Sequence, residues 1–160
     1  MSLASFYRTS LAGDVTQDVP LSEELAVQRL YLDIEGTRFS DRLKTEFDIP
    51  ESLTTRLVPG MILQPLVENA IKHGVSRTAQ AVTIRISAQA DAAGLKLTVC
   101  DDAPHASEAR GGSGIGLSNV RDRLMARYGD DARIEAAPLP GKGYCVTLFL
   151  PEDGGDDEQR

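Results

Sequence analysis

Residues 63–74 carry four polar side chains whose types and spacing suit a metal ion and a phosphate group. The segment reads LQPLVENAIKHG. On a helix its apolar residues recur at three- and four-residue spacings, and Glu68, Asn69, Lys72 and His73 share a neighbouring face. Carboxylate and carboxamide oxygens suit Mg²⁺, and a lysine one turn further on can meet a phosphate that the metal carries. The pattern favours a metal–nucleotide site; the alternative is a half-buried helix whose polar residues face water.

A second candidate is Asp101, which ends an apolar run with the alternation of a strand. Leu95, Leu97 and Val99 precede it at every second position. A carboxylate at the end of a strand can accept a hydrogen bond from an exocyclic amine such as that of adenine, and a base with a carbonyl there does not offer this donor. The alternative is a loop aspartate that caps a turn.

Glycines are concentrated in residues 111–117, GGSGIGL, directly before a predicted helix. Because glycine has no Cβ atom, backbone N–H groups and the positive end of the helix can approach phosphate oxygens closely. The segment does not fit a dinucleotide-binding fingerprint, and no Walker-type lysine follows it. A phosphate-binding loop of another kind and a plain flexible loop both stay open. Residues 141–143, Gly-Lys-Gly, are likewise either part of the site or a simple hairpin turn.

The composition fits one domain and disfavours several classes of function. With 160 residues, of which 41% are hydrophobic, the chain can bury a single core. It has no apolar run long enough to span a bilayer and no secretory signal pattern. The net charge of −7 disfavours nucleic acid as a partner, because such binding depends on clustered basic residues. Cys100 and Cys145 lack metal-ligand spacing, so we expect two reduced core thiols; a disulfide between neighbouring strands is the alternative.

Helices must position these residues. Ser22 is the expected N-cap of a first helix, with two glutamates in its first turn. Its expected buried residues are Leu25, Leu30, Tyr31, Ile34 and Phe39. In the central helix, Pro59 suits the first turn, Pro65 restarts or kinks the helix, and Gly74 ends it. A last helix is expected from Leu117 to a stop at Gly129.

The strands predict the fold class. Residues 42–49 alternate as a half-exposed strand, and two further strands around Ile84 and Leu97 form an antiparallel hairpin whose turn spans residues 88–94. A short strand at Ile134 and a strong one over residues 144–150 follow. The sequence therefore predicts an α+β fold, a two-layer sandwich with helices packed on one face of a mixed, mostly antiparallel sheet.

In this order the three pieces resemble the ATP-binding domain of the GHKL superfamily, and more closely that of the LytS-type sensor histidine kinases. Residues 63–74 match the LQPLVENAIKHG signature of that group throughout. Residues 21–39 are similar to the segment that joins its dimerisation region to the ATPase domain. Residues 114–124, GIGLSNVRDRL, are similar to its glycine box and the helix that follows. The resemblance covers nearly all of the chain up to Pro151.

The resemblance implies a Bergerat-type ATP-binding fold and a role for each matched position. Asn69 would ligate Mg²⁺, Glu68 would be a nearby acid or base, and Lys72 and His73 would contact phosphates or ribose. Of these, Glu68 and Lys72 are the candidate catalytic residues. Asp101 would hold the adenine amine. The implied phosphate and lid-hinge contacts fall on Gly112, Gly114, Gly116 and the adjoining Leu117.

The implied activity is that of a protein histidine kinase in a two-component signal transduction system, with ATP and Mg²⁺ as cofactors. We expect residues 1–20 to hold the end of an upstream dimerisation helix region, a linker and an expression remnant, residues 21–151 to form the ATP-binding domain, and residues 152–160 to form a disordered acidic tail. The expected partners are the upstream dimerisation and phosphoacceptor region, a second copy of the full-length protein and a response regulator. The expected location is the cytoplasm, with any membrane anchor in regions outside this chain.

The chain departs from the family pattern in two places. Residues 101–105, Asp-Asp-Ala-Pro-His, stand where the family usually has Asp-Asn-Gly-Pro-Gly, so both glycines are replaced. Tyr144 stands where a threonine usually helps to bind the base through water. Unchanged and weakened nucleotide binding both stay open, and His105 is interpreted as an exposed loop residue.

The histidine content limits what this chain can do alone. Its two histidines are His73, inside the nucleotide motif, and His105, in the expected lid. Neither lies on a dimerisation helix, so the phosphoacceptor is expected outside this chain. Two alternatives stay open: a nucleotide-sensing or assembly module without turnover, and an ATP hydrolase of the same fold in which Glu68 activates water.

Overall fold

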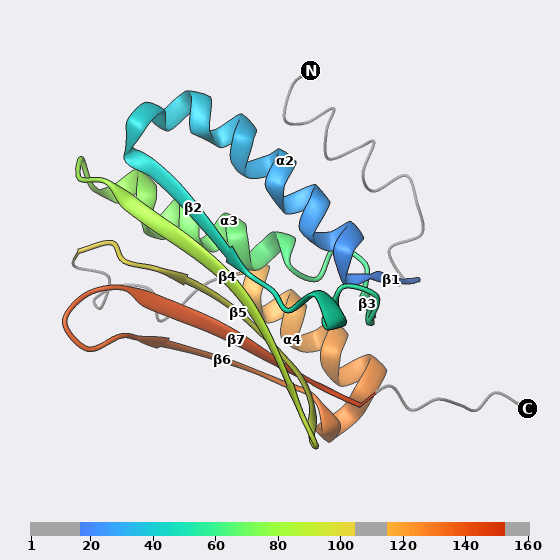
Figure 1. The fold of residues 1–160 in the computed structure, drawn as a ribbon. Coiled ribbons are helices and arrows are strands. Elements are labelled where there is room, and N and C mark those ends of the chain that lie inside the picture. The colour runs from blue at the N-terminus through green and yellow to red at the C-terminus, as the bar shows by residue number, and fades with distance from the viewer. Residues whose placement is uncertain (1–16, 105–114, 153–160) are drawn as a thin grey trace, which may run out of the picture.

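A five-stranded sheet forms one layer of the domain in a computed structural model that describes residues 17–104 and 115–152 (Figure 1). Its strands are β2 (Leu43–Asp48), β4 (Val82–Asp91), β5 (Gly94–Asp101), β6 (Arg133–Pro138) and β7 (Tyr144–Pro151). Their spatial order is β2-β4-β5-β7-β6, in which β2 and β4 pair in parallel and the other neighbours are antiparallel. The predicted mixed, mostly antiparallel sheet is confirmed.

Three helices form the second layer, and all of them cover the same face of the sheet (Figure 1). They are α2 (Leu21–Phe39), α3 (Gln64–His73) and α4 (Ile115–Tyr128). The helix α2 packs over β2, α3 over β5 and α4 over β6. Four 3₁₀ turns complete the connections: η1 (Ser40–Arg42), η2 (Glu51–Leu53), η3 (Val75–Arg77) and η4 (Gly129–Asp131).

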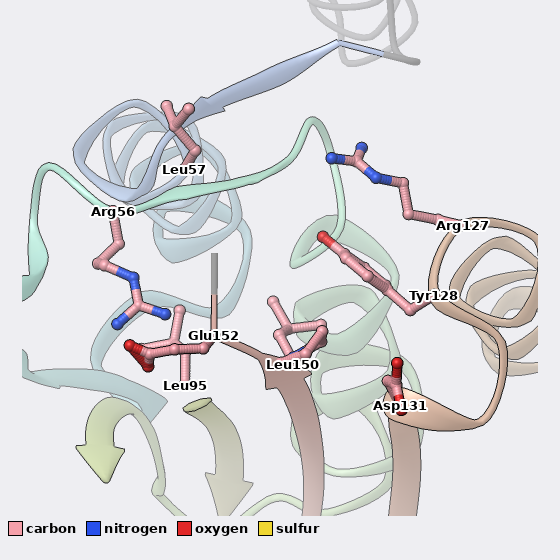
Figure 2. A pocket seen from close by; sticks show the side chains of 9 residues that line it. Arg56, Leu57, Leu95, Arg127, Tyr128, Asp131, Leu150 and Glu152 are labelled. Atoms are coloured by element: carbon pink, nitrogen blue, oxygen red, sulfur yellow. The ribbon is translucent and has the colours of Figure 1, made fainter. Parts of the chain in front are cut away.

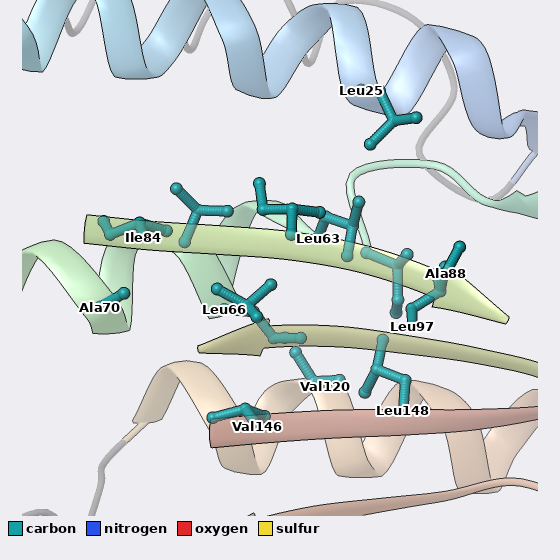
Figure 3. Close-up of a cluster of buried hydrophobic side chains, with 14 of the residues drawn as sticks. Leu25, Leu63, Leu66, Ala70, Ile84, Ala88, Leu97, Val120, Val146 and Leu148 are labelled. Atoms are coloured by element: carbon teal, nitrogen blue, oxygen red, sulfur yellow. The ribbon is translucent and has the colours of Figure 1, made fainter. Parts of the chain in front are cut away.

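The hydrophobic core fills the space between the two layers (Figure 3). Alternate residues of β4, β5 and β7 are buried, while the residues between them are half-buried or exposed, which is the pattern of a sheet with one wetter face. Leu66 of α3, Leu97 of β5 and Leu148 of β7 are each fully buried. Since burying one such side chain stabilises a fold by about 1.5–3 kcal/mol, this layer holds the three helices against the sheet.

The first helix differs from its prediction at its start and along its buried face. It begins at Leu21 with Pro20 at the N-cap, and no side chain caps it, so the prediction of Ser22 as N-cap was wrong. Leu30, predicted to be buried, is 47% exposed. Three polar residues are buried instead: Glu24, Gln28 and Glu35. These find their partners on the same helix or on segments far along the chain, which a helical pattern alone does not reveal.

A small second sheet precedes the central helix. The strands β1 (Asp18–Pro20) and β3 (Leu57–Pro59) pair antiparallel, and this pairing was not predicted. Pro59 therefore belongs to a strand and not to the first turn of α3, which contains Pro65 instead. The predicted end of α3 at Gly74 is confirmed.

The hairpin of β4 and β5 is longer than predicted. Its strands pair from Ile84 with Asp101 to Asp91 with Gly94, so the turn is much shorter than the predicted residues 88–94. Asp91 accepts hydrogen bonds from the backbone N–H groups of Ala93 and Gly94, which fixes the turn. Gly94 has a φ of 141°, and a Cβ atom there would lie 2.0 Å from the carbonyl oxygen of Leu150, so only glycine fits.

The two cysteines form a disulfide between β5 and β7, which corrects the expectation of reduced core thiols. Cys100 and Cys145 are directly opposite each other in the antiparallel register, and their Cα atoms are 4.1 Å apart. Both are half-buried on the wetter face of the sheet. An alternating strand predicts which face a residue occupies only after the register is known, and the register here brings the two thiols together.

Several predicted segments lie outside the described residues. These are residues 1–16, with the expected end of an upstream helix, residues 105–114, with His105, Gly112 and Gly114, and residues 153–160, with most of the acidic tail. Within the described part of the chain, none of the helices has the length and apolarity needed to cross a membrane.

Candidate functional site

The central helix α3 has a buried apolar face and a polar face next to it. Its apolar side, which includes Leu66, Val67, Ala70 and Ile71, is buried in the core. Glu68, Asn69 and His73 are half-buried and Lys72 is exposed. The prediction that the four polar residues share one face of α3 beside the core is therefore confirmed. Lys72 and His73 lie in the last turn, where positive charge complements the negative end of the helix.

A buried carboxylate on α2 fixes the start of α3. Glu24 is 2% exposed and accepts hydrogen bonds from the backbone N–H groups of Met61, at 2.6 Å, and Leu63, at 3.1 Å. Burial raises the pKa of Glu24 above its ordinary value of 4.5, while these backbone N–H groups and the charge of Arg123 oppose the rise. Arg123 of α4 also donates to the carbonyl oxygen of Gly60 at 2.9 Å. Two helices thus hold the loop from which α3 begins.

A chain of polar side chains runs from α2 to Glu68. Gln28 Nε2 donates to Gln64 Oε1 at 3.0 Å, and Gln64 Nε2 donates to Glu68 Oε2 at 3.3 Å. Gln28 is fully buried and Gln64 is 5% exposed. The sequence analysis missed both residues, because amides within helical patterns look like surface residues until their distant partners are known. For Gln28 the sequence signal is its place on the same helical face as the buried residues Leu21, Tyr31 and Leu32, and for Gln64 it is its place within the motif of residues 63–74.

Asp101 lies against the end of α3. It is 3% exposed, and its Oδ1 atom accepts a hydrogen bond from the backbone N–H of Ala103 at 3.0 Å. A Cβ atom added to Gly74 would lie 3.0 Å from the Asp101 Cγ atom and 3.1 Å from its Oδ2 atom. The missing side chain of Gly74 therefore provides the space that the carboxylate occupies. The structure brings Asp101 and the C-terminal end of the predicted helix together.

The glycine turn between β6 and β7 packs on the other side of Asp101. Gly143 has a φ of 99°, and a Cβ atom there would lie 2.5 Å from the backbone oxygen of Asp101. The backbone N–H of Gly143 donates to Ala103 at 3.0 Å. Tyr144 is opposite Asp101 in the register of β5 and β7, and both side chains lie on the buried face of the sheet. Residues 141–143 are thus more than a hairpin turn, because they hold the segment that follows Asp101.

Two of the residues that depart from the family pattern have clear structural partners. Asp102 accepts a hydrogen bond from the backbone N–H of Thr83 at 2.8 Å and so ties the end of β5 to the start of β4. Ala103 is 1% exposed and joins Asp101 to Gly143 through its backbone. Hydrogen bonds therefore fix both residues that follow Asp101.

The start of α4 lies near the start of α3. A Cβ atom added to Gly116 would lie 3.9 Å from the Cβ atom of Pro65. Gly116 is exposed, and Leu117 is buried with the core. Pro65 and Gly74 are nine residues apart, so roughly 14 Å of helix separates the α4 end of the polar face from the Asp101 end. Three features therefore lie along α3. The N-terminus of α4 lies near its start, Glu68 and Asn69 lie in its middle, and Asp101 lies at its C-terminal end.

The donor atoms suit a metal ion that a ligand helps to hold. No group of three or more His, Cys, Asp or Glu residues within residues 17–104 and 115–152 is arranged to hold a metal ion. The available oxygen donors beside the polar face are the side chains of Asn69 and Glu68 on one helix. Mg²⁺ usually binds one or two protein oxygens together with water and substrate phosphates, so this small donor set fits Mg²⁺ carried by a nucleotide.

A separate pocket lies at the opposite end of the sheet (Figure 2). It has a volume of about 400 Å³, and its lining includes Arg56, Leu95, Arg127, Leu150 and Glu152. Leu95 and Asp101 are six residues apart on β5, which corresponds to roughly 20 Å along an extended strand. This pocket is therefore distinct from the site at Asp101, and its Arg127 forms an ion pair with Asp18.

Comparison with known families gives two matches that together span most of the chain. The family described as "Histidine kinase-, DNA gyrase B-, and HSP90-like ATPase" matches residues 56–154. A second family, described as "Histidine kinase", matches residues 1–43. The first match contains α3, Asp101 and both glycine segments, and the second contains α2.

The curated relatives include sensor histidine kinases. Sensor histidine kinase BtsS of Escherichia coli strain K12 is 37% identical over 149 residues, which cover 93% of this chain and 26% of the relative. Sensor histidine kinase YesM of Bacillus subtilis strain 168 is 33% identical over 137 residues, which cover 83% of this chain and 24% of the relative. The chain spans about a quarter of the length of these relatives.

Solved structures share the fold. The histidine kinase AdeS of Acinetobacter baumannii has a TM-score of 0.64 at 18% identity, with 95% of this chain and 74% of that chain covered. The catalytic domain of the histidine kinase ThkA has a TM-score of 0.63 at 14% identity, with 84% of this chain and 96% of that chain covered. At these identities the likeness concerns the fold alone, and it agrees with the predicted two-layer α+β architecture.

Proposed function

We propose that this chain, which belongs to the histidine kinase-, DNA gyrase B- and HSP90-like ATPase family, is the ATP-binding catalytic domain of a sensor histidine kinase. Its reaction would transfer the γ-phosphoryl group of Mg-ATP to a histidine outside this segment. The observation that carries the proposal is the alignment of Asp101, the polar face of α3 and the start of α4 along one helix. The sensor histidine kinases among the curated relatives support the same assignment.

Asp101 would recognise the base. Its carboxylate packs against Gly74, its backbone oxygen packs against Gly143, and its Oδ1 atom already accepts one backbone hydrogen bond. A carboxylate accepts further hydrogen bonds, so it can take one from the exocyclic amine of adenine. Guanine carries a carbonyl oxygen at the corresponding position, and two acceptors facing each other would disfavour GTP.

The polar face of α3 would bind the phosphates and Mg²⁺. Asn69 supplies a neutral oxygen ligand for the metal, Lys72 supplies a positive charge for a phosphate, and His73 reaches phosphate or ribose. The glycines expected to complete the phosphate contacts are Gly112, Gly114 and Gly116, with Leu117 next to them at the start of α4. The N–H groups at this helix end can donate to phosphate oxygens.

Glu68 would act as the nearby acid or base in the transfer step. In that step, a nitrogen of the acceptor imidazole forms the new bond to the γ-phosphorus while the bond from phosphorus to the bridging oxygen of ADP breaks. The acceptor imidazole gains positive charge, and a carboxylate within reach can stabilise that charge or accept the proton. Most of the rate enhancement would come from positioning and charge neutralisation, as in other phosphoryl transfers.

The whole protein would supply the remaining parts. The acceptor histidine, the dimerisation region and any sensor or membrane anchor are proposed to lie in segments other than residues 21–151, which we take as the ATP-binding domain. A homodimer of the longer protein would bring the acceptor to the site, and a response regulator would then receive the phosphoryl group. We propose the cytoplasm as the location of this domain.

A second candidate function is nucleotide sensing without turnover. It is favoured by Tyr144, a large buried side chain directly opposite Asp101 where the family usually has a small hydroxyl residue. Tyr144 could narrow the base end and slow turnover while ADP or ATP still binds. The third possibility, an ATP hydrolase, would require Glu68 to activate water.

One experiment distinguishes these functions. The longer protein that contains both this chain and the acceptor histidine is incubated with Mg-[γ-³²P]ATP, and acid-labile protein phosphate and free phosphate are measured. Acid-labile phosphate on a histidine supports the kinase. Binding of ATP without either product supports sensing, and free phosphate from the 160-residue chain alone supports hydrolysis. Either of the last two results would refute the kinase proposal.

A further inference from the structure

We propose that Gln28 of α2 is a positioning residue that orients Glu68 through Gln64. This inference rests on the proposed role of Glu68 in phosphoryl transfer. It assigns a function in the reaction to Gln28, which lies outside the motif of residues 63–74 and on a different helix. The role is indirect: Gln28 contacts Gln64, and Gln64 contacts the side chain that would face the reacting groups.

The direction of the hydrogen bonds follows from Glu68. A carboxylate has no hydrogen to donate, so Gln64 must turn its Nε2 group towards Glu68. The Gln64 Oε1 atom then points to α2, where only a donor can meet it. Gln28 provides that donor through Nε2 at 3.0 Å. The hydrogen bond to Glu68 thus determines the orientation of both amides, and conversely the amides restrain the rotamer of Glu68.

Gln28 is buried for the sake of its donor group. The side chain is fully buried, and its Oε1 atom has no hydrogen-bond partner among the residues that the structure describes. A buried acceptor without a partner destabilises a fold, so Gln28 occupies this position at a cost. In return its Nε2 group donates to Gln64, the residue next to Glu68 in the chain of hydrogen bonds.

The neighbouring turn of α2 keeps this arrangement in register. Glu24 lies four residues before Gln28 and binds the backbone just before α3. The two contacts therefore fix both the start of α3 and the side chain one turn inside it. Any displacement of α2 along its axis would be transmitted to Glu68 through Gln64, which makes α2 a mechanical link between the segment that precedes it and the catalytic face.

The first test is spectroscopic and does not depend on catalysis. In the 160-residue chain, the side-chain amide resonances of Gln64 are assigned with Gln64→Met in a ¹H–¹⁵N spectrum. We expect Gln28→Met and Glu68→Gln each to shift these resonances, because each removes a partner of the Gln64 amide. Glu35→Gln is the matched control: Glu35 is also buried on α2, but it pairs with Arg38 of the same helix. Unchanged Gln64 resonances in Gln28→Met would overturn the proposal.

The second test is kinetic and uses the longer protein with its acceptor histidine. We expect Gln28→Met to lower kcat for histidine phosphorylation about tenfold while KM for ATP stays within twofold. Combined with Glu68→Gln, Gln28→Met should have no further effect, because its role is exerted through Glu68. Full multiplication of the two effects, or an unchanged kcat in Gln28→Met, would refute the positioning role.

A variant that keeps the size of the side chain distinguishes loss of the hydrogen bond from misfolding. Gln28→Glu has the same size but presents an acceptor to Gln64 Oε1, so kcat should fall at least as far as in Gln28→Met. If both variants melt at the wild-type temperature and retain the wild-type kcat, the proposal is wrong. Absence of any histidine phosphate in the wild-type protein would instead refute the kinase function, and the amide resonances would still decide whether the hydrogen-bond chain exists.

Discussion

Replacing Gly74 with alanine tests whether the contact between α3 and Asp101 forms the base end of the site. An added Cβ atom would lie 2.6 Å from the carbonyl oxygen of Ala70 and 3.1 Å from the Asp101 Oδ2 atom. Real Cβ contacts are 3.0 Å or longer, so the nearer atom must move by at least about 0.4 Å, the difference between 3.0 and 2.6. The φ of Gly74 is −105°, which alanine can adopt, so the effect comes from space and not from backbone strain.

The expected size of the effect follows from the bond that is disturbed. A hydrogen bond to a charged group contributes about 1.5–3 kcal/mol, and each 1.4 kcal/mol changes affinity about tenfold. If the substitution moves Asp101 away from its adenine-binding position, Gly74→Ala should lower ATP affinity about 10- to 100-fold. Overpacking in a close contact should also lower the free energy of unfolding by about 1–3 kcal/mol.

Isothermal calorimetry with Mg-ATP and urea unfolding of the 160-residue chain measure both effects. The matched control is Gly36→Ala in α2, where an added Cβ atom meets nothing within 4 Å. That substitution should raise stability by about 0.5–1 kcal/mol through helix propensity and leave ATP affinity unchanged. ATP binding by Gly74→Ala within twofold of the wild type would show that the space beside Gly74 is not required for the nucleotide.

Further substitutions test the remaining parts of the site. Asp101→Asn should lower ATP affinity at least tenfold and reduce the preference for ATP over GTP, measured by calorimetry with both nucleotides, because an amide can donate to a carbonyl; an unchanged preference would contradict the base-binding role. Asn69→Ala should weaken Mg-ATP binding far more than Lys142→Ala, and equal effects would place the metal elsewhere. The raised pKa of Glu24 means that the folded state binds this proton more tightly than the unfolded state. As pH rises above 4.5, the ordinary pKa of this carboxyl, the unfolding free energy of the wild type should therefore fall relative to that of Glu24→Gln, and the opposite trend in urea titrations would show that Arg123 outweighs burial. A chain that begins at residue 44 and so lacks α2 should have no cooperative thermal transition, which circular dichroism would detect.

The main elements of the fold could be predicted because local patterns determine them. The spacing of Leu66, Ala70 and Ile71 indicated both that α3 is a helix and which side of it is buried, and alternation indicated β4, β5 and β7. The four polar residues of α3 followed from the same spacing. These predictions needed only the periodicity of helices and strands, which the sequence displays within ten residues.

The errors arose where a partner lies far away in the sequence. Gln28 is buried against its partner Gln64, which lies 36 residues further along the chain. Glu24 is buried against the backbone of Leu63, which lies 39 residues further along the chain. Ser22 was predicted to cap α2 because serine is a preferred N-cap residue, and Leu30 was predicted to be buried because leucine usually is. The disulfide of Cys100 with Cys145 depended on the register of β5 and β7, which alternation alone leaves undetermined.

The buried polar contacts of α2 bear on where the ATP-binding domain begins. The two family matches divide the chain between residues 43 and 56 and so place α2 with a different family from α3. The physical contacts do not follow that division, because Glu24 binds the backbone that starts α3 and Gln28 continues into the polar chain that reaches Glu68. Without α2, the N–H groups of Met61 and Leu63 would lose their acceptor, and the core would lose Leu21 and Leu25. The helix that joins this domain to whatever precedes it is therefore part of the same folding unit as the site, and a change in its position cannot occur without changing the environment of Glu68.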